Sequence, residues 1–126
     1  MPDLQKKKIL IIEDDRALQS AMLEILAQEG YETVSAYDGE EGVHKAETEK
    51  PDLILLDLIL PKKDGYEVLA EIKNGPDKNI PVLILTNLEE IENVQKALEL
   101  GANTFMVKSD FSLRDIIEKI KENLPK

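Results

Sequence analysis

An unbroken aliphatic run that ends in a single acid places the strongest constraint on the fold. Residues 51–57 read Pro-Asp-Leu-Ile-Leu-Leu-Asp, so an apolar stretch leads directly into Asp57. Such a run is typical of a strand buried on both faces, as in a parallel sheet covered by helices. Open α/β sheets bind ligands in the crevice beyond the carboxyl ends of these strands. Asp57 is therefore the first candidate for chemistry, although an acid here could equally begin a polar turn.

The segments on either side of this run alternate between strand and helix patterns. The predicted strands are Lys8 to Glu13, Glu32 to Ala36, the run ending at Asp57, Ile80 to Thr86 and Thr104 to Val107. The predicted helices are Arg16 to Glu29, Asp38 to Glu49, Gly65 to Lys73, Leu88 to Leu100 and Leu113 to Asn123. Regular alternation with short connections gives a parallel sheet with right-handed crossovers and helices on both faces. The expected fold class is α/β, in the form of a three-layer α/β/α sandwich.

Four of the predicted helices begin with the same pattern of two polar residues. In each, a short polar side chain is followed three positions later by an acid; the pairs are Asp38/Glu41, Asp64/Glu67, Asn87/Glu90 and Ser112/Asp115. Such pairs satisfy free backbone amides and place negative charge at the positive end of the helix dipole. They therefore predict where these helices begin, while Gly30 and Gly101 predict two helix ends.

Length and composition exclude several classes of protein. A chain of 126 residues suits one domain, and it contains no apolar run near the ~20 residues that cross a membrane. It has no cysteine, so disulfides are excluded and the cytoplasm is the expected compartment. A formal net charge of −10 repels nucleic acid and anionic lipid. We expect no direct nucleic-acid binding and no membrane insertion.

Polar residues stand at the carboxyl ends of four predicted strands. Glu13-Asp14-Asp15 follows the first strand, Asp57 ends the third, and Thr86 and Lys108 stand at the ends of the fourth and fifth. Carboxylates gathered in one crevice repel each other unless a cation is bound. Mg²⁺ accepts one or two carboxylates and leaves room for phosphate oxygens. A phosphoryl group bound beside this ion would still need a hydroxyl donor and a mobile positive charge. Thr86 offers the hydroxyl, and Lys108 offers the positive charge.

With these residues in place, the chain resembles the receiver domains of bacterial two-component response regulators. The resemblance runs from about Lys8 to Asn123, and its marks are Glu13-Asp14, Asp57, Pro61, Asp64-Gly65, Thr86 and Lys108. It implies a single receiver domain over residues 1–126, of the stand-alone type. It also implies a flavodoxin-like fold of five parallel strands in the order 2-1-3-4-5 with five helices.

The resemblance further implies a metal site and a phosphoacceptor. Asp57 would accept a phosphoryl group from a phosphohistidine on a histidine kinase or a histidine phosphotransfer protein. Asp14, Asp57 and the backbone carbonyl of Ile59 would bind Mg²⁺ directly, with Glu13 acting through water. Asp15 extends the acid run, and we interpret it as a helix cap rather than a ligand. Glu13 and Asp14 could also be cap residues, but that reading does not explain the acid at position 57.

A switch follows from the same resemblance. Ionised Asp57 would attack phosphorus in line while Mg²⁺ and Lys108 neutralise the phosphoryl oxygens. The product would draw the Thr86 hydroxyl inward and let the Phe105 ring turn, reshaping the surface of the fourth helix, fifth strand and fifth helix. That surface would control a separate effector protein or form a phosphorylation-dependent dimer. The chain would catalyse its own phosphorylation and slow dephosphorylation, as a signalling switch rather than a metabolic enzyme.

The sequence departs from the family pattern at two positions. Receivers usually carry a proline after the lysine, commonly through a cis peptide bond, whereas Ser109 follows Lys108. Because a cis bond without proline costs about 2.5–4 kcal/mol, the loop that carries Lys108 is expected to be set differently. Asn87 stands where the family often has a small residue, so its side chain would narrow access to the phosphoryl site.

Three other classes of function remain as alternatives. A haloacid-dehalogenase-type phosphatase also uses a strand-end aspartate with Mg²⁺, but it needs a second acid where this chain has Ile59. A flavodoxin-like electron carrier needs a Ser/Thr/Gly-rich phosphate loop, and Asp14-Asp15-Arg16 would repel the flavin phosphate instead. A pseudo-receiver that takes no phosphate would serve purely as a docking module. His44 lies among charged residues in a predicted helix, and we interpret it as a surface residue rather than a phosphotransfer histidine.

Overall fold

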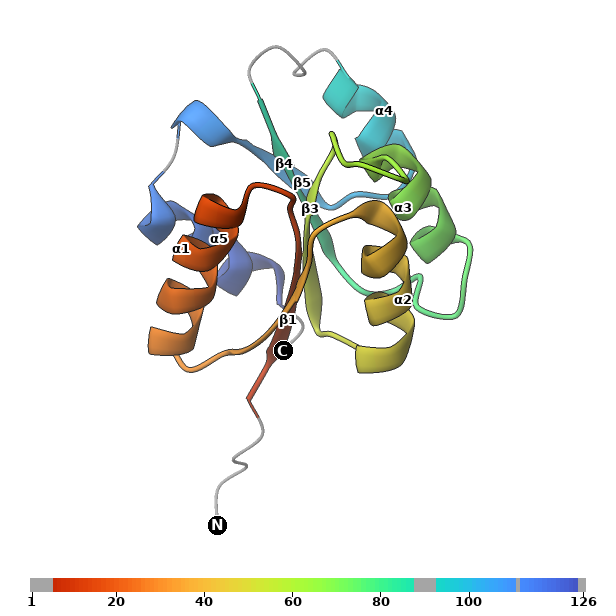
Figure 1. The fold of residues 1–126 in the computed structure, drawn as a ribbon. Coiled ribbons are helices and arrows are strands. Elements are labelled where there is room, and N and C mark those ends of the chain that lie inside the picture. The colour runs from red at the N-terminus through yellow and green to blue at the C-terminus, as the bar shows by residue number, and fades with distance from the viewer. Residues whose placement is uncertain (1–5, 88–92, 111, 125–126) are drawn as a thin grey trace.

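A five-stranded parallel sheet forms the centre of the molecule (Figure 1). The computed structural model describes residues 6–87, 93–110 and 112–124. Its strands are β1 (Lys8–Ile12), β2 (Glu32–Ala36), β3 (Leu53–Asp57), β4 (Val82–Thr86) and β5 (Thr104–Val107). They pair in parallel in the order β2-β1-β3-β4-β5, which confirms the predicted flavodoxin-like topology.

Helices cover both faces of this sheet. They are α1 (Arg16–Gln28), α2 (Gly39–Glu49), α3 (Gly65–Lys73), α4 (Val94–Glu99) and α5 (Leu113–Asn123). Figure 1 shows α1 and α5 together on one side of the strands and α2, α3 and α4 on the other. The three-layer α/β/α arrangement predicted from the alternation of patterns is therefore confirmed.

Two hydrophobic clusters hold the three layers together. Successive side chains of a strand point to opposite faces. Accordingly, Ile9 and Ile11 of β1 pack in the cluster beneath α1 and α5, whereas Leu10 and Ile12 pack in the cluster beneath α2, α3 and α4. Every residue of β3 and β4 is buried. The prediction that the run ending at Asp57 is a central, doubly covered strand is thus confirmed.

The capping pairs form at three of the four predicted positions. The side chains of Asp38, Asp64 and Ser112 accept hydrogen bonds from the backbone N–H three residues on, at 2.8, 2.9 and 3.2 Å. The fourth pair includes Glu90, which lies outside the described residues. The predicted helix Leu88 to Leu100 is described only from Asn93 onward, and there α4 spans Val94–Glu99 without a side-chain cap.

The start of the fourth strand differs from the prediction for a local physical reason. The fourth strand begins at Val82 rather than Ile80, because the Ile80 N–H donates to the Asp77 carbonyl in a turn and Pro81 has no N–H for a ladder. An unpredicted 3-10 turn, Lys108–Asp110, follows β5. Among the described helices, none is long and apolar enough to cross a membrane.

Candidate functional site

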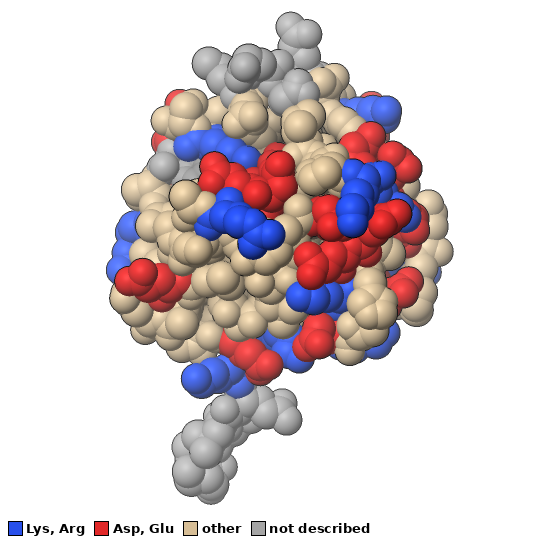
Figure 2. All heavy atoms as spheres, viewed as in Figure 1, with Lys and Arg blue, Asp and Glu red and all other residues tan. Residues whose placement is uncertain are grey.

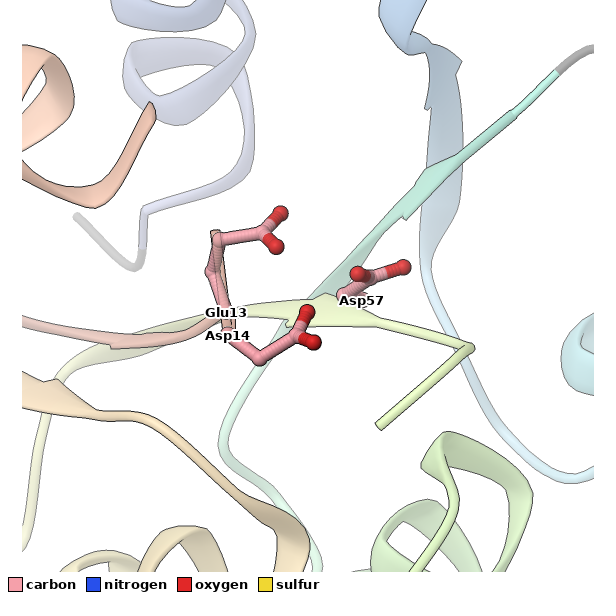
Figure 3. A group of neighbouring side chains, drawn as sticks. All are labelled: Glu13, Asp14 and Asp57. Atoms are coloured by element: carbon pink, nitrogen blue, oxygen red, sulfur yellow. The ribbon is translucent and has the colours of Figure 1, made fainter. Parts of the chain in front are cut away.

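Three carboxylates meet at the carboxyl edge of the sheet (Figure 3). Glu13 and Asp14 follow β1, and Asp57 is the last residue of the neighbouring strand β3. One oxygen from each carboxylate lies within 4.8 Å of the other two. Glu13 is fully buried and Asp57 is 4% exposed, while Asp14 is exposed to solvent. The structure therefore brings together the three acids that the sequence placed at separate strand ends.

Lys108 reaches the same cluster from the end of β5. Its Nζ lies 2.7 Å from Glu13 Oε1 and 3.0 Å from Asp57 Oδ2, so one ammonium is shared by the two buried carboxylates. The described residues contain no cis peptide bond, and Lys108 itself begins the 3-10 turn that replaces the proline of the family pattern. The loop after β5 therefore forms a short 3-10 turn, and the Lys108 side chain still contacts Glu13 and Asp57.

Burial and charge together set the protonation of this cluster. Burial raises the pKa of Glu13 to about 7; the ammonium of Lys108 and the Asp15 N–H, 3.0 Å from Oε2, oppose that rise, and the Asp57 carboxylate adds to it. Burial alone would lower the pKa of Lys108, but its contacts with Glu13 and Asp57 outweigh burial and raise it. Lys108 is therefore charged at neutral pH, and Glu13 titrates near neutrality.

The residues of the cluster fit a hard divalent cation. Carboxylate oxygens are the ligands that Mg²⁺, Ca²⁺ and Mn²⁺ prefer. Glu13 Oε1 is buried and accepts no hydrogen bond of good geometry within the described part of the chain, although it lies beside Lys108. One lysine cannot neutralise three carboxylates, so the cluster keeps an excess of negative charge. Cation binding would remove that repulsion.

One face of the molecule is mixed in charge (Figure 2). On the face that Figure 2 shows, basic side chains lie beside acidic ones rather than forming one broad basic area. The chain as a whole carries 26 acidic against 16 basic residues. The positive charge of Lys108 is a local feature of the acid cluster, where its Nζ contacts Glu13 and Asp57.

Ile59 and Gly65 connect the site to the segment after β3. The Ile59 N–H donates to Asp57 Oδ1 at 3.2 Å, and the Ile59 side chain is 52% exposed. The role of its carbonyl as a metal ligand stays a prediction. A Cβ at Gly65 would lie 2.5 Å from the Asp57 carbonyl oxygen, so only glycine lets α3 begin this close to the end of β3. This close approach gives the Asp64-Gly65 pair a structural reason.

The two residues predicted to form the switch lie on β4 and β5. Thr86 is 1% exposed and its hydroxyl donates to the Asn87 carbonyl at 3.2 Å. Phe105 is partly buried and packs against the cluster beneath α2, α3 and α4. In the register of these strands, Ile84 pairs with Phe105 and Thr86 pairs with Val107. Both residues therefore lie on adjacent strands near the site, and their switch roles stay predictions.

Some polar residues near the site have structural roles. Asp15 caps α1 by accepting a hydrogen bond from the Leu18 N–H at 3.1 Å, as predicted. His44 is exposed on α2, also as predicted. Gln19 was missed: it is fully buried and donates hydrogen bonds to backbone carbonyls at the end of β1. The sequence signal for its burial was its helical spacing from Met22 and Leu26, with which it shares the buried face of α1.

Comparison with known proteins identifies the class of this site. A family model for the response regulator receiver domain matches residues 9–121. The alkaline phosphatase synthesis transcriptional regulatory protein PhoP of Bacillus subtilis is 42% identical over 115 residues, which cover 91% of this chain and 47% of that protein. Sporulation initiation phosphotransferase F of the same species is 36% identical over 122 residues, covering 97% of both chains.

A solved structure agrees in fold as well. The receiver domain of sensor histidine kinase PA1611 from Pseudomonas aeruginosa, with a magnesium ion coordinated in its active-site cleft, superposes with a TM-score of 0.84 at 27% identity. The match covers 94% of this chain and 97% of that one. The chain belongs to the response regulator receiver domain family. Its class of function is that of a phosphoacceptor module in two-component signalling, and it spans about half the length of PhoP.

Proposed function

We propose that Asp57 is the phosphoacceptor of this receiver and that Mg²⁺ is its cofactor. The observation that carries the proposal is the shared position of Lys108 Nζ, within 3.0 Å of Asp57 and 2.7 Å of Glu13 at the carboxyl edge of the sheet. Asp14, Asp57 and the Ile59 carbonyl would hold the ion, with Glu13 acting through water. When bound, the ion supplies neutralising charge for the phosphoryl oxygens.

The side chains at the site suit nucleophilic transfer. An Asp57 carboxylate oxygen would form the bond to phosphorus while the phosphorus–nitrogen bond of a phosphohistidine breaks, and the imidazole leaves with that electron pair. Asp57 Oδ1 is held by the Ile59 N–H and Oδ2 by Lys108, which orients the carboxylate before attack. After transfer, Lys108 would pair with a phosphoryl oxygen instead. Its ammonium already lies within reach.

The output would pass through Thr86 and Phe105. Among the described residues, the Thr86 hydroxyl bonds to the neighbouring Asn87 carbonyl alone, a neutral contact that a charged phosphoryl oxygen can outcompete. Its movement would leave room for the partly buried Phe105 ring and alter the surface formed by α4, β5 and α5. The partners of this surface would be an effector protein or a second phosphorylated copy. A histidine kinase or phosphotransfer protein would supply the phosphoryl group, in the cytoplasm.

Phosphorylation of the purified protein by a small donor tests this function. We expect acetyl phosphate or phosphoramidate to add one phosphoryl group in Mg²⁺ but not in EDTA, as seen by intact-protein mass spectrometry. Asp57→Asn should abolish the mass shift. Asp52→Asn is a matched control, because Asp52 lies near the amino end of the same strand, where it accepts a hydrogen bond from the Lys8 N–H. A wild-type protein that gains no phosphoryl group would support the pseudo-receiver alternative instead.

A further inference from the structure

Gln19 is a fully buried polar residue in the first half of α1. Its Nε2 lies 3.1 Å from the Ile11 carbonyl, 3.2 Å from the Glu13 carbonyl and 3.1 Å from the Ala36 carbonyl. These three oxygens belong to the ends of two paired strands, β1 and β2. A single side chain thus joins the helix to both strands at the edge where the acids emerge.

The contact with the Glu13 carbonyl matters most for the site. That carbonyl belongs to the peptide group that joins Glu13 to Asp14. The Asp14 carboxylate itself makes no hydrogen bond or ion pair with any described residue. Its position in the cluster therefore depends on the backbone at residues 13–15. Gln19 is the side chain that holds the carbonyl of this backbone.

Other contacts fix the rest of the segment but leave this peptide group to Gln19. The Glu13 N–H donates to the Ala36 carbonyl at 3.0 Å, and the Asp15 N–H donates to Glu13 Oε2 at 3.0 Å. Neither bond involves the Glu13 carbonyl. Without a donor from Gln19, the plane of the Glu13–Asp14 peptide could rotate, and the Asp14 carboxylate would move with it.

The amide of Gln19 is not explained by packing alone. Its Oε1 is buried and has no hydrogen-bond partner among the described residues, which is an unfavourable state for a polar atom. A methionine or leucine would fill the same space without burying that oxygen. The benefit of glutamine at this position must therefore come from its Nε2 donors.

We propose that Gln19 is a positioning residue of the metal site, which holds the Glu13–Asp14 peptide so that Asp14 faces the cation. The proposal rests on the proposed function, since it assumes that the three carboxylates bind Mg²⁺. Residues that orient metal ligands without touching the metal typically change affinity by about 10–100-fold when they are replaced. Gln19 would belong to this class.

The test is Mg²⁺ binding to Gln19→Met, measured by isothermal titration calorimetry on the unphosphorylated protein. Methionine is close to glutamine in size and shape but donates no hydrogen bond. We expect the dissociation constant to rise about tenfold. Met22→Leu is the matched control, because Met22 is also fully buried on the same face of α1, and its affinity should equal that of the wild type. In the metal-free protein, the Asp14 amide signal should shift in an NMR spectrum of Gln19→Met but not of Met22→Leu.

The outcomes separate this inference from the proposed function. If the wild type binds no Mg²⁺, the metal role of the cluster and the inference both fail. If the wild type binds Mg²⁺ and Gln19→Met binds it equally well, only the role of Gln19 is overturned. Should Gln19→Met not fold, as judged by circular dichroism, Gln19→Asn takes its place. Its amide is one methylene too short to reach all three carbonyls, so the same loss of affinity is expected, and wild-type affinity would refute the proposal.

Discussion

Replacing Glu13 by glutamine should remove a pH-dependent part of the stability of this fold. Burial raises the pKa of Glu13 from 4.5 to about 7. Between these values the folded protein holds a proton on Glu13 that the unfolded chain has released. The stability contributed by Glu13 is therefore complete below pH 4.5 and is lost as pH rises through 7. Glu13→Gln carries no titrating proton at this position and should lack this loss.

The size of the effect follows from the shift in pKa. Each pKa unit is worth about 1.4 kcal/mol, so the full shift corresponds to about 3 kcal/mol. Asp14, beside Glu13 in the cluster, is exposed to solvent, and water there screens part of this penalty. We therefore expect the difference in unfolding free energy between wild type and Glu13→Gln to fall by about 2 kcal/mol from pH 4.5 to pH 7.5.

Urea unfolding of both proteins in EDTA, at several pH values, measures this difference directly. Other titrating groups are common to the two proteins, and Lys108 keeps its charge over this range because its pKa is raised. Their contributions cancel when the two curves are subtracted. With saturating Mg²⁺ the decline should shrink, because a cation favours the ionised carboxylate. A difference that stays constant with pH in EDTA would refute the reasoning that Glu13 is protonated in the folded metal-free site.

Two further predictions concern Asp14 and the lifetime of the phosphorylated state. Asp14→Ala should raise the unfolding free energy in EDTA by about 1 kcal/mol, because it removes a repulsion between like charges that is worth about this much in water. The same substitution should weaken Mg²⁺ binding. An unchanged or lower denaturation midpoint in EDTA would contradict this prediction. Ile59 cannot orient an attacking water, and neither can Leu88, which lies outside the described residues. The phosphorylated form of the wild type should therefore persist. The double variant Ile59→Asn with Leu88→Glu should speed dephosphorylation at least about tenfold. An unaltered rate of dephosphorylation would show that other residues set the lifetime.

The central strands and most helix starts could be predicted because local chemistry decides them. Residues 53–56, which precede Asp57, are all aliphatic and offer no polar side chain for an exposed face, so they favour a buried central strand. The cap at Ser112 needs only two residues three apart, and both of its reciprocal bonds are present. The acid cluster could be predicted for a related reason, since parallel strands bring their carboxyl ends to one edge.

Contacts that depend on packing between distant segments could not be read from the sequence. Nothing in the pattern shows that Lys108 lies between Glu13 and Asp57, because this requires β5, β1 and β3 to be placed in space. Gln19 reads as a polar residue in an amphipathic helix, and only its burial against two strand ends reveals its three acceptors. The start of the fourth strand also depended on a turn bond at Ile80 that spacing does not encode.

The charges at the strand ends explain why Asp14 would be the critical ligand of a bound cation, although it is the most exposed of the three acids. One ammonium faces three carboxylates, so an ionised cluster keeps two negative charges, which a single divalent cation would neutralise. Glu13 and Asp57 already share Lys108, and a cation that draws on their oxygens must weaken those contacts. Asp14 has no partner to lose within the described residues, so its carboxylate would contribute its full attraction to a bound cation. Because the Glu13–Asp14 peptide must be held in place for this advantage, the proposed contribution of Asp14 would depend on the hydrogen bond from Gln19 to the Glu13 carbonyl.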